Sequence, residues 1–342
     1  MESRVLAPTR IALIGPNFFS YIDGIRRKML EKGLDVESFD ERHSNTPFVK
    51  ALYRLGYYRL FAERRQQHLA DIAAKLVAGR FSDVLLINVE VPDRPFVQRI
   101  VDAGLRVHIY MWDSTLNKPG YVEFLDLLQG KASFDPRDCA KLGLRYVPLF
   151  ADDTFSGKRP PRTSAQYEPV IDIFFCGTLH SNRAKLIAEL EHYSNKRKLQ
   201  LSMLLYFHSR WMFAIKSLVI HSNILFILRV SSKIFPKHQI CESFQRAKFV
   251  FDLPHPGQTG LTARTFEVLR TGTRLITFNA QAYSLLPKSL SERVTVIERI
   301  SDLDKIDFKN AAALAPLSKE DEHYLSIERF VDEMIDLITK SS

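Results

Sequence analysis

The chain has 342 residues, of which 46% are hydrophobic and 25% charged, and this composition fits a soluble protein of two domains. Its net charge of +9 and pI of about 9.4 favour acidic partners, namely phosphates, nucleic acid or an anionic membrane surface. Three cysteines without paired spacing argue against a disulfide framework or zinc motif, and we expect neither a signal peptide nor a membrane span.

The first half alternates apolar, strand-like runs with helical segments, which is the pattern of a parallel sheet. We expect strands at residues 10–15, 34–39, 81–88, 106–112, 132–135 and 146–150, and helices at 21–32, 48–78 and 95–103. The first strand is not followed by the Gly-x-Gly-x-x-Gly of a dinucleotide fold, so we do not expect NAD binding. Asp113 follows an expected strand. Acids there point into the ligand crevice of a parallel sheet, although Asp113 could equally form a turn or cap a helix.

Two segments mix basic side chains with apolar ones. Residues 48–65 interleave Lys and Arg with aromatic residues, and residues 209–237 are very apolar but interrupted by Arg and Lys. Both patterns are typical of elements that lie on a lipid headgroup layer. Ordinary packed helices with a solvated basic face explain the same residues.

The second half repeats the pattern after a Pro- and Gly-containing linker at residues 154–169. Expected strands cover residues 171–176, 199–206, 249–253, 274–278 and 294–297, and expected helices cover 181–193, 239–246, 262–272 and 318–340. The last helix has an apolar face too long to leave in water. We expect an N-terminal Rossmann-like domain (1–153) and a C-terminal one (170–317). We also expect the final helix (318–342) to pack on the first domain, because this would bury its apolar face.

The clearest binding pattern lies between residues 249 and 278, where a strand, a Pro/Gly-rich loop, a helix and a strand follow one another. The loop brings three residues to the start of the helix: Thr259, Gly260 and Thr262. Free backbone N–H groups and the positive end of the dipole make that place an anion site, and Thr262 can cap the helix. Arg264 opposes the dipole unless an anion is bound, and Glu267 could accept hydrogen bonds from a ribose. A capped helix with a solvated Arg is the simpler alternative.

Five strings in this order resemble bacterial capsule, exopolysaccharide and lipopolysaccharide glycosyltransferases related to the spore-maturation type. They are FFSY at 18–21, YMWDS at 110–114 with Asn117, SFD at 133–135 with Asp138, and the runs 172–183 and 255–267. The resemblance covers roughly residues 10–300. It implies an α/β fold with two Rossmann-like domains facing a central cleft (GT-B) and a C-terminal helix that crosses back to the first domain.

The resemblance also implies a hexosyltransferase-like activity that moves a sugar from a nucleotide-sugar donor, by expectation a UDP-sugar, to a saccharide acceptor. The implied donor-binding residues are Gly177, Thr178, His180, Arg183, His255, Gln258, Thr259, Gly260, Leu261, Thr262, Arg264 and Glu267. Fixed N–H groups and Arg side chains would neutralise the leaving diphosphate, so we expect no metal ion or other cofactor. Many retaining members carry an acid eight residues before this Glu, where this chain has Thr259, which favours an inverting enzyme.

An inverting enzyme needs a base for the acceptor hydroxyl, and Asp113 is our first candidate, before Asp23 and Asp40. We expect a lipid-linked acceptor, an anionic membrane surface as partner, and a cytoplasmic location at the inner membrane face. Three alternatives stay open: a nucleotide-sugar-modifying enzyme such as an epimerase, a basic nucleic-acid-binding protein, and an inactive carbohydrate-binding relative. The absence of a nucleic-acid-binding motif argues against nucleic acid as a partner.

Overall fold

The computed structural model describes residues 10–16, 21–44, 61–156, 171–178, 183–207, 230–255, 257–311 and 314–340. Several sequence-based predictions fall outside these ranges: residues 48–60 of the first basic-aromatic segment, most of the linker, residues 209–229, and His180. The chain divides into two units. Unit 1 comprises Met1–Pro148, Gly257–Gly260 and Ile327–Ser342, and unit 2 comprises Leu149–Pro256 and Leu261–Ser326.

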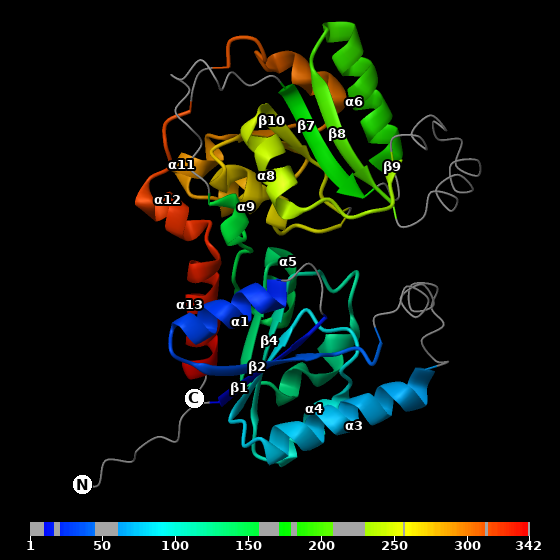
Figure 1. The fold of residues 1–342 in the computed structure, drawn as a ribbon, viewed down its shortest axis with the longest axis vertical. Coiled ribbons are helices and arrows are strands. Elements are labelled where there is room, and N and C mark those ends of the chain that lie inside the picture. The colour runs from blue at the N-terminus through cyan, green and yellow to red at the C-terminus, as the bar shows by residue number, and fades with distance from the viewer. Residues whose placement is uncertain are drawn as a thin grey trace. The chain divides into compact units, whose positions relative to one another are not determined.

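Unit 1 is built on a six-stranded sheet in the order β2-β1-β3-β4-β5-β6, with every pair parallel (Figure 1). Its elements are β1 (Arg10–Gly15), α1 (Tyr21–Glu31), β2 (Asp35–Asp40), α3 (Ala62–Ala78), β3 (Asp83–Ile87), α4 (Arg94–Asp102), β4 (Arg106–Met111), η2 (Gly120–Leu127), β5 (Gly130–Ser133), α5 (Pro136–Leu142), β6 (Arg145–Tyr146) and α13 (Ile327–Thr339).

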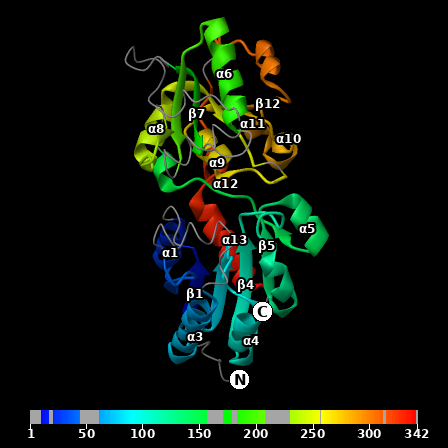
Figure 2. The ribbon, with the colours of Figure 1, turned by 90° about the vertical axis from the view of Figure 1, so that its right-hand side faces the viewer.

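The three strands β1, β3 and β4 are buried almost throughout, as expected for strands covered by helices on both faces. Alternate strand residues such as Ile14 and Leu86 join the apolar sides of α3, α4 and η2 in one core cluster. On the other face α13 contacts β5 and α1, as Figure 2 also shows. There the ring of Phe330 meets the ring of Tyr110 edge-on, with the centroids 4.8 Å apart.

Unit 2 also has a six-stranded, all-parallel sheet, in the order β12-β11-β10-β7-β8-β9. Its elements are η3 (Asp153–Phe155), β7 (Ile171–Thr178), α6 (Arg183–Arg197), β8 (Leu201–Tyr206), β9 (Val230–Ser231), α8 (Lys237–Gln245), β10 (Ala247–Asp252), α9 (Ala263–Arg270), β11 (Arg274–Thr277), α10 (Ala282–Leu285), α11 (Lys288–Ser291), β12 (Val294–Val296), η5 (Ile300–Lys305) and α12 (Lys319–Tyr324).

Helices cover both faces of this sheet as well. Phe175 of β7 joins Ile187 of α6 and Leu303 of η5 in one core cluster. Its neighbour Phe174 points the other way and meets Phe244 of α8, with ring centroids 5.8 Å apart. Two parallel α/β sheets of this kind confirm the predicted fold class of two Rossmann-like units.

The C-terminal segment departs from the prediction of one helix over residues 318–340. It forms two helices, of which α12 belongs to unit 2 and α13 to unit 1. At the break the carbonyl of Leu325 accepts the backbone N–H of Ala151 at 2.8 Å, and Ser326 forms an isolated parallel bridge with Ala151.

A second difference concerns the strand that was predicted at residues 146–150. The structure has only the two-residue β6 there. Pro148 has no N–H to donate, so the ladder cannot continue through it.

Candidate functional site

The order of the strands in unit 2 marks a specific place on the sheet. From β7 the chain winds outward through β8 and β9, and it then returns to the other side of β7 as β10. In open parallel sheets ligands bind outside the carboxyl ends of the strands at such a switch point. The carboxyl ends of β7 and β10 carry Gly177, Thr178 and Asp252, so two of the predicted donor-binding residues lie at this position.

Arg183 connects the ends of these two strands. Its guanidinium donates to the carbonyl oxygen of Thr178 after β7, at 3.5 Å, and to that of Leu253 after β10, at 2.5 Å. Burial lowers the pKa of Arg183, the charge of Asp252 opposes this, and Arg264 adds to it. The Nε of Arg183 is buried and has no hydrogen-bond partner among the described residues.

Asp252 is the acidic residue at the centre of this group of charged side chains. Only 9% of its surface is exposed, and Thr262 donates its hydroxyl to Oδ2 at 2.7 Å. Burial raises the pKa of Asp252, while the Thr262 hydrogen bond and the charges of Arg264 and Arg183 pull it down. Protonation of Asp252 removes its negative charge and makes the net charge of this cluster more positive.

Glu267 and Arg264 form an ion pair within α9, with Nη1 and Oε2 2.8 Å apart. Thr262 caps the same helix by accepting the N–H of Thr265 on its hydroxyl. Glu267 is 5% exposed, so its side chain is almost fully enclosed by the protein. The role of Glu267 toward a ribose stays a prediction.

The remaining predicted donor residues are divided between the two units. Leu261 is buried in unit 2, and His255 is half-buried in the loop after β10. Gln258, Thr259 and Gly260 cluster with unit 1. Within unit 2 the structure therefore groups Arg183, Arg264 and Thr262 with Asp252.

In unit 1 the loop residues bind the carboxylate of Asp135, which caps α5 and is fully buried. Asp135 accepts the backbone N–H of Thr259 at 2.8 Å, its hydroxyl at 2.5 Å, and the N–H of Gly260 at 3.4 Å. Burial alone would raise the pKa of Asp135, but the bonds from Thr259 and Gly260 and from its own helix hold it below the ordinary value. The N–H groups predicted to meet a diphosphate thus donate to a carboxylate in this structure.

The three candidate bases differ in their surroundings. Asp113 follows β4, is half-buried and accepts the side-chain amides of Asn117 and Gln258 on Oδ1, each at 2.8 Å. Asp23 is exposed in the first turn of α1. Asp40 ends β2 and accepts the backbone N–H of Arg42 at 2.9 Å. The carboxylate of Asp113 is thus held by two side-chain amides.

Sequence reasoning assigned no role to Asp252 or Asp135. Both stand at or just after the carboxyl end of a parallel strand, β10 and β5 respectively. The rule that singled out Asp113 could have found them too.

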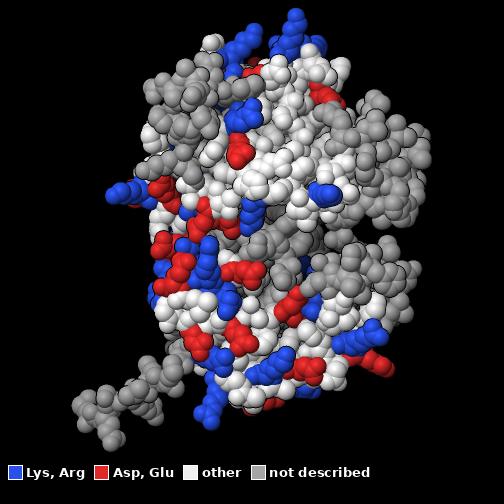
Figure 3. Space-filling view, in the orientation of Figure 1, with Lys and Arg blue, Asp and Glu red and all other residues white. Residues whose placement is uncertain are grey.

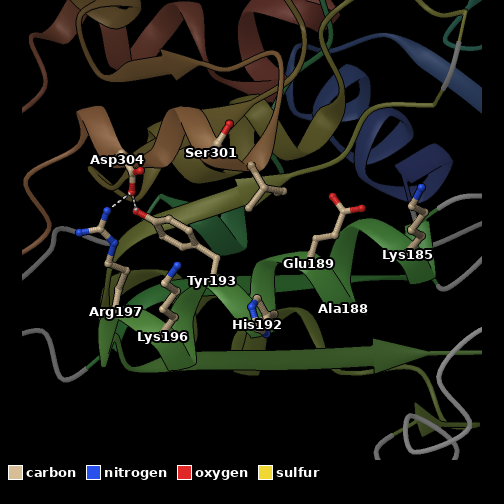
Figure 4. A pocket seen from close by; sticks show the side chains of 10 residues that line it. Lys185, Ala188, Glu189, His192, Tyr193, Lys196, Arg197, Ser301 and Asp304 are labelled. Carbon is tan, nitrogen blue, oxygen red and sulfur yellow. Dashed lines mark hydrogen bonds and ion pairs between the residues drawn. The ribbon is translucent and has the colours of Figure 1, made fainter.

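The groove that α6 and η5 form lies along a helix face of unit 2 and has a volume of about 640 Å³ (Figure 4). In it Tyr193 and Arg197 both point to Asp304, and their polar atoms lie 3.0 Å and 2.6 Å from its Oδ1. None of its lining residues belongs to the predicted donor-binding set.

No group of three or more His, Cys, Asp or Glu side chains in the described ranges could hold a metal ion. Within the same ranges, no helix is both long and apolar enough to span a membrane.

Comparisons with known proteins identify the fold. No protein-family model matches the sequence, and no curated protein does. Among solved structures, alpha,alpha-trehalose 6-phosphate synthase from Burkholderia multivorans matches with a TM-score of 0.58 and 10% identity, over 98% of this chain and 97% of that one. S. aureus MnaA, solved with UDP, matches with 0.56 and 7% identity, over 98% of each chain.

A third similar structure is UDP-GlcNAc 2-epimerase from Methanocaldococcus jannaschii, in complex with UDP-GlcNAc and UDP. Its TM-score is 0.53 at 10% identity, and the match covers 96% of this chain and 99% of that one. At such low identity the likeness extends to the fold alone. The chain has the GT-B fold.

Proposed function

We propose that the protein is a glycosyltransferase that takes a sugar from a nucleotide-sugar donor. The observation that carries the proposal is the pair Arg183 and Arg264, both of which interact with Asp252 at the switch point of unit 2. Proteins with a similar fold were solved with UDP or UDP-GlcNAc, which supports a UDP-sugar as the donor.

In the proposed donor complex the diphosphate lies against the two guanidinium groups. A buried donor without a partner costs about 1–3 kcal/mol, so the Nε of Arg183 would gain from a phosphate oxygen. Fixed cations and N–H groups stabilise the charge that develops on the leaving diphosphate, and we propose that no metal ion is needed for this. Glu267 would bind the ribose once Arg264 turns toward the phosphates.

In the proposed transfer step Asp113 is the base. Its carboxylate accepts the proton of an acceptor hydroxyl while the hydroxyl oxygen forms a bond to the anomeric carbon of the sugar. The bond from that carbon to the phosphate oxygen breaks, and the nucleoside diphosphate leaves with the electron pair. This attack from the opposite side inverts the configuration of the sugar, in line with Thr259 at the position of the missing second acid.

A nucleotide-sugar epimerase is the second candidate, because several of the similar structures are UDP-GlcNAc 2-epimerases that match almost the whole chain. The two activities differ in their products. An epimerase alters the sugar without an acceptor, whereas a transferase releases the nucleotide and forms a new glycoside. Incubation with a panel of nucleotide sugars, followed by mass spectrometry and NMR of the products, distinguishes them.

Nucleic acid is a less suitable partner than a nucleotide sugar. On the face drawn in Figure 3, Lys and Arg side chains are interspersed with Asp and Glu. A nucleic-acid-binding surface usually has its basic residues in one patch or stripe. A gel-shift assay with random DNA and RNA tests this alternative.

Replacing Glu267 with Ala should weaken the binding of UDP by about one to two decades. The loss corresponds to a charge-assisted hydrogen bond to the ribose, about 1.5–3 kcal/mol. Calorimetry on the folded variant measures it. Glu31→Ala is a matched control, because Glu31 also pairs with a cation three residues away, Lys28, but on α1 of unit 1. Equal UDP affinity in Glu267→Ala and wild type would remove Glu267 from the site.

We further propose that the acceptor is a lipid-linked saccharide for bacterial surface polysaccharide, and that the protein acts in the cytoplasm at the inner membrane face. The net charge of +9 and the two basic, apolar segments of the sequence support this.

Vesicles with an anionic lipid such as phosphatidylglycerol should bind the protein at low salt and release it as salt is added, because ions screen headgroup attraction. Co-sedimentation measures the bound fraction, and neutral phosphatidylcholine vesicles are the control. If the protein does not bind anionic vesicles at low salt, a soluble acceptor becomes the better hypothesis.

A further inference from the structure

Two side-chain amides hold the carboxylate of Asp113 by the same oxygen. The Nδ2 of Asn117 and the Nε2 of Gln258 each donate to Oδ1 at 2.8 Å. Among the described residues, no donor binds Oδ2. Fixing one oxygen of a carboxylate fixes the direction of the other, which suits an atom that must meet a hydroxyl in one geometry.

The two amides come from different parts of the chain. Asn117 is four residues from Asp113 and belongs to the same turn after β4. Gln258 is 145 residues away, in the loop Gly257–Gly260. Its reach to Asp113 therefore depends on how firmly this loop is fixed in unit 1.

The start of α5 fixes the loop on both sides of Gln258. Asp135 accepts hydrogen bonds from Thr259 and Gly260, and the guanidinium of Arg137 donates to the carbonyl oxygen of Gly257. Because both neighbours of Gln258 are bonded to one helix end, the backbone at Gln258 has little freedom.

Gly260 adds a steric constraint. A Cβ at this position would lie 2.4 Å from the carbonyl oxygen of Phe134, so only glycine lets the loop approach the end of β5 so closely. Gly257 has a φ of +86°, which also favours glycine and turns the chain just before Gln258. Two glycines thus allow the close and curved path that brings the Gln258 amide to Asp113.

We propose that Gln258 is a positioning residue, anchored by Asp135 and Arg137, that orients Asp113 so that Oδ2 receives the proton of the acceptor hydroxyl. The inference rests on the proposed function, in which Asp113 is the base. It gives Gln258 a part in activating the acceptor, whereas the family resemblance implied a contact with the donor.

Gln258→Met tests the proposal, because Met keeps the length of the side chain and removes the amide. We expect kcat to fall about 10- to 100-fold, the size of a lost hydrogen bond to a charged group, while KM for the donor and UDP affinity stay at wild-type values. In the Asp113→Asn background the same change should lower kcat less than threefold, since Gln258 acts through Asp113.

Gln98→Met is the matched control, because Gln98 donates the same kind of bond to Asp102 at 2.7 Å on the exposed side of α4. It should leave kcat unchanged, and urea denaturation checks that all variants fold. Wild-type kcat in Gln258→Met, or a loss that adds fully to that of Asp113→Asn, would overturn the inference while Asp113 remains the base. Equal turnover of Asp113→Asn and wild type would instead show that Asp113 is not the base, and this would overturn the inference together with that assignment.

Discussion

Asp113→Asn should lower turnover by about two to four decades and leave UDP affinity nearly unchanged. Asparagine keeps the shape of the side chain and can still accept from Asn117 and Gln258, but it cannot take a proton from a hydroxyl. Steady-state release of UDP measures turnover, and calorimetry measures UDP affinity. A fall in kcat without a change in nucleotide binding is the signature of a group that acts only in the transition state.

Asp23→Asn is the comparison that makes this result specific. Asp23 was the second candidate base, and it is exposed on α1. If Asp113 is the base, Asp23→Asn should keep wild-type turnover. The reverse outcome, with normal turnover in Asp113→Asn and loss in Asp23→Asn, would move the base to α1.

Removal of either arginine at the switch point should lower turnover by about two to three decades. Arg183→Ala and Arg264→Ala each take away a cation that would neutralise the leaving diphosphate, and the loss of one such preorganised group typically costs 10²–10³ in rate. UDP affinity should fall as well, because the same cations bind the diphosphate before the reaction. The measurements are UDP release and calorimetry on each purified variant.

Arg270→Ala controls for the general loss of a buried arginine. Arg270 ends α9, donates to the carbonyl oxygen of Ala151 at 2.8 Å and pairs with Asp153 at 3.5 Å. Its loss should reduce the free energy of unfolding and leave UDP affinity unchanged. If Arg183→Ala and Arg264→Ala behave like Arg270→Ala, with lower stability and normal turnover, all three arginines serve the fold.

The alternation of strands and helices could be predicted because it depends on local patterns. Apolar runs such as residues 10–15 and 249–253 are long enough to fill a buried strand, and glycines such as Gly33 and Gly272 follow helices with a positive φ. The break between α12 and α13 could not be predicted in this way. At the break Leu325 accepts a hydrogen bond from Ala151, which is far away in sequence.

Part of the candidate site could be predicted because it also depends on local sequence patterns. Thr262 caps α9, and Arg264 and Glu267 lie on that helix. The sequence alone therefore indicated that these three residues are neighbours. Arg183 can bond to the carbonyl oxygens of both Thr178 and Leu253 because β10 returns beside β7, and only the sheet order reveals this.

The partners of the loop residues were beyond local reasoning. The sequence alone indicates no bonding partner for the backbone N–H groups of Thr259 and Gly260. In the structure they donate to Asp135, which lies more than 120 residues earlier in the chain. A contact between residues so far apart in sequence is set by the packing of the chain. The residues around the loop do not indicate it. The loop is therefore attached to Asp135, which follows the end of β5 and caps α5.

The most direct test of the proposed transferase follows the fate of the nucleotide. The wild-type protein is incubated with UDP-GlcNAc and other nucleotide sugars, with and without a detergent extract of bacterial membrane lipids, and the products are analysed by mass spectrometry and NMR. We predict that UDP appears together with an equal amount of a new glycoside, only when the extract is present, and that Asp113→Asn forms both about two to four decades more slowly. A sugar that changes configuration without any acceptor would contradict this account and identify an epimerase.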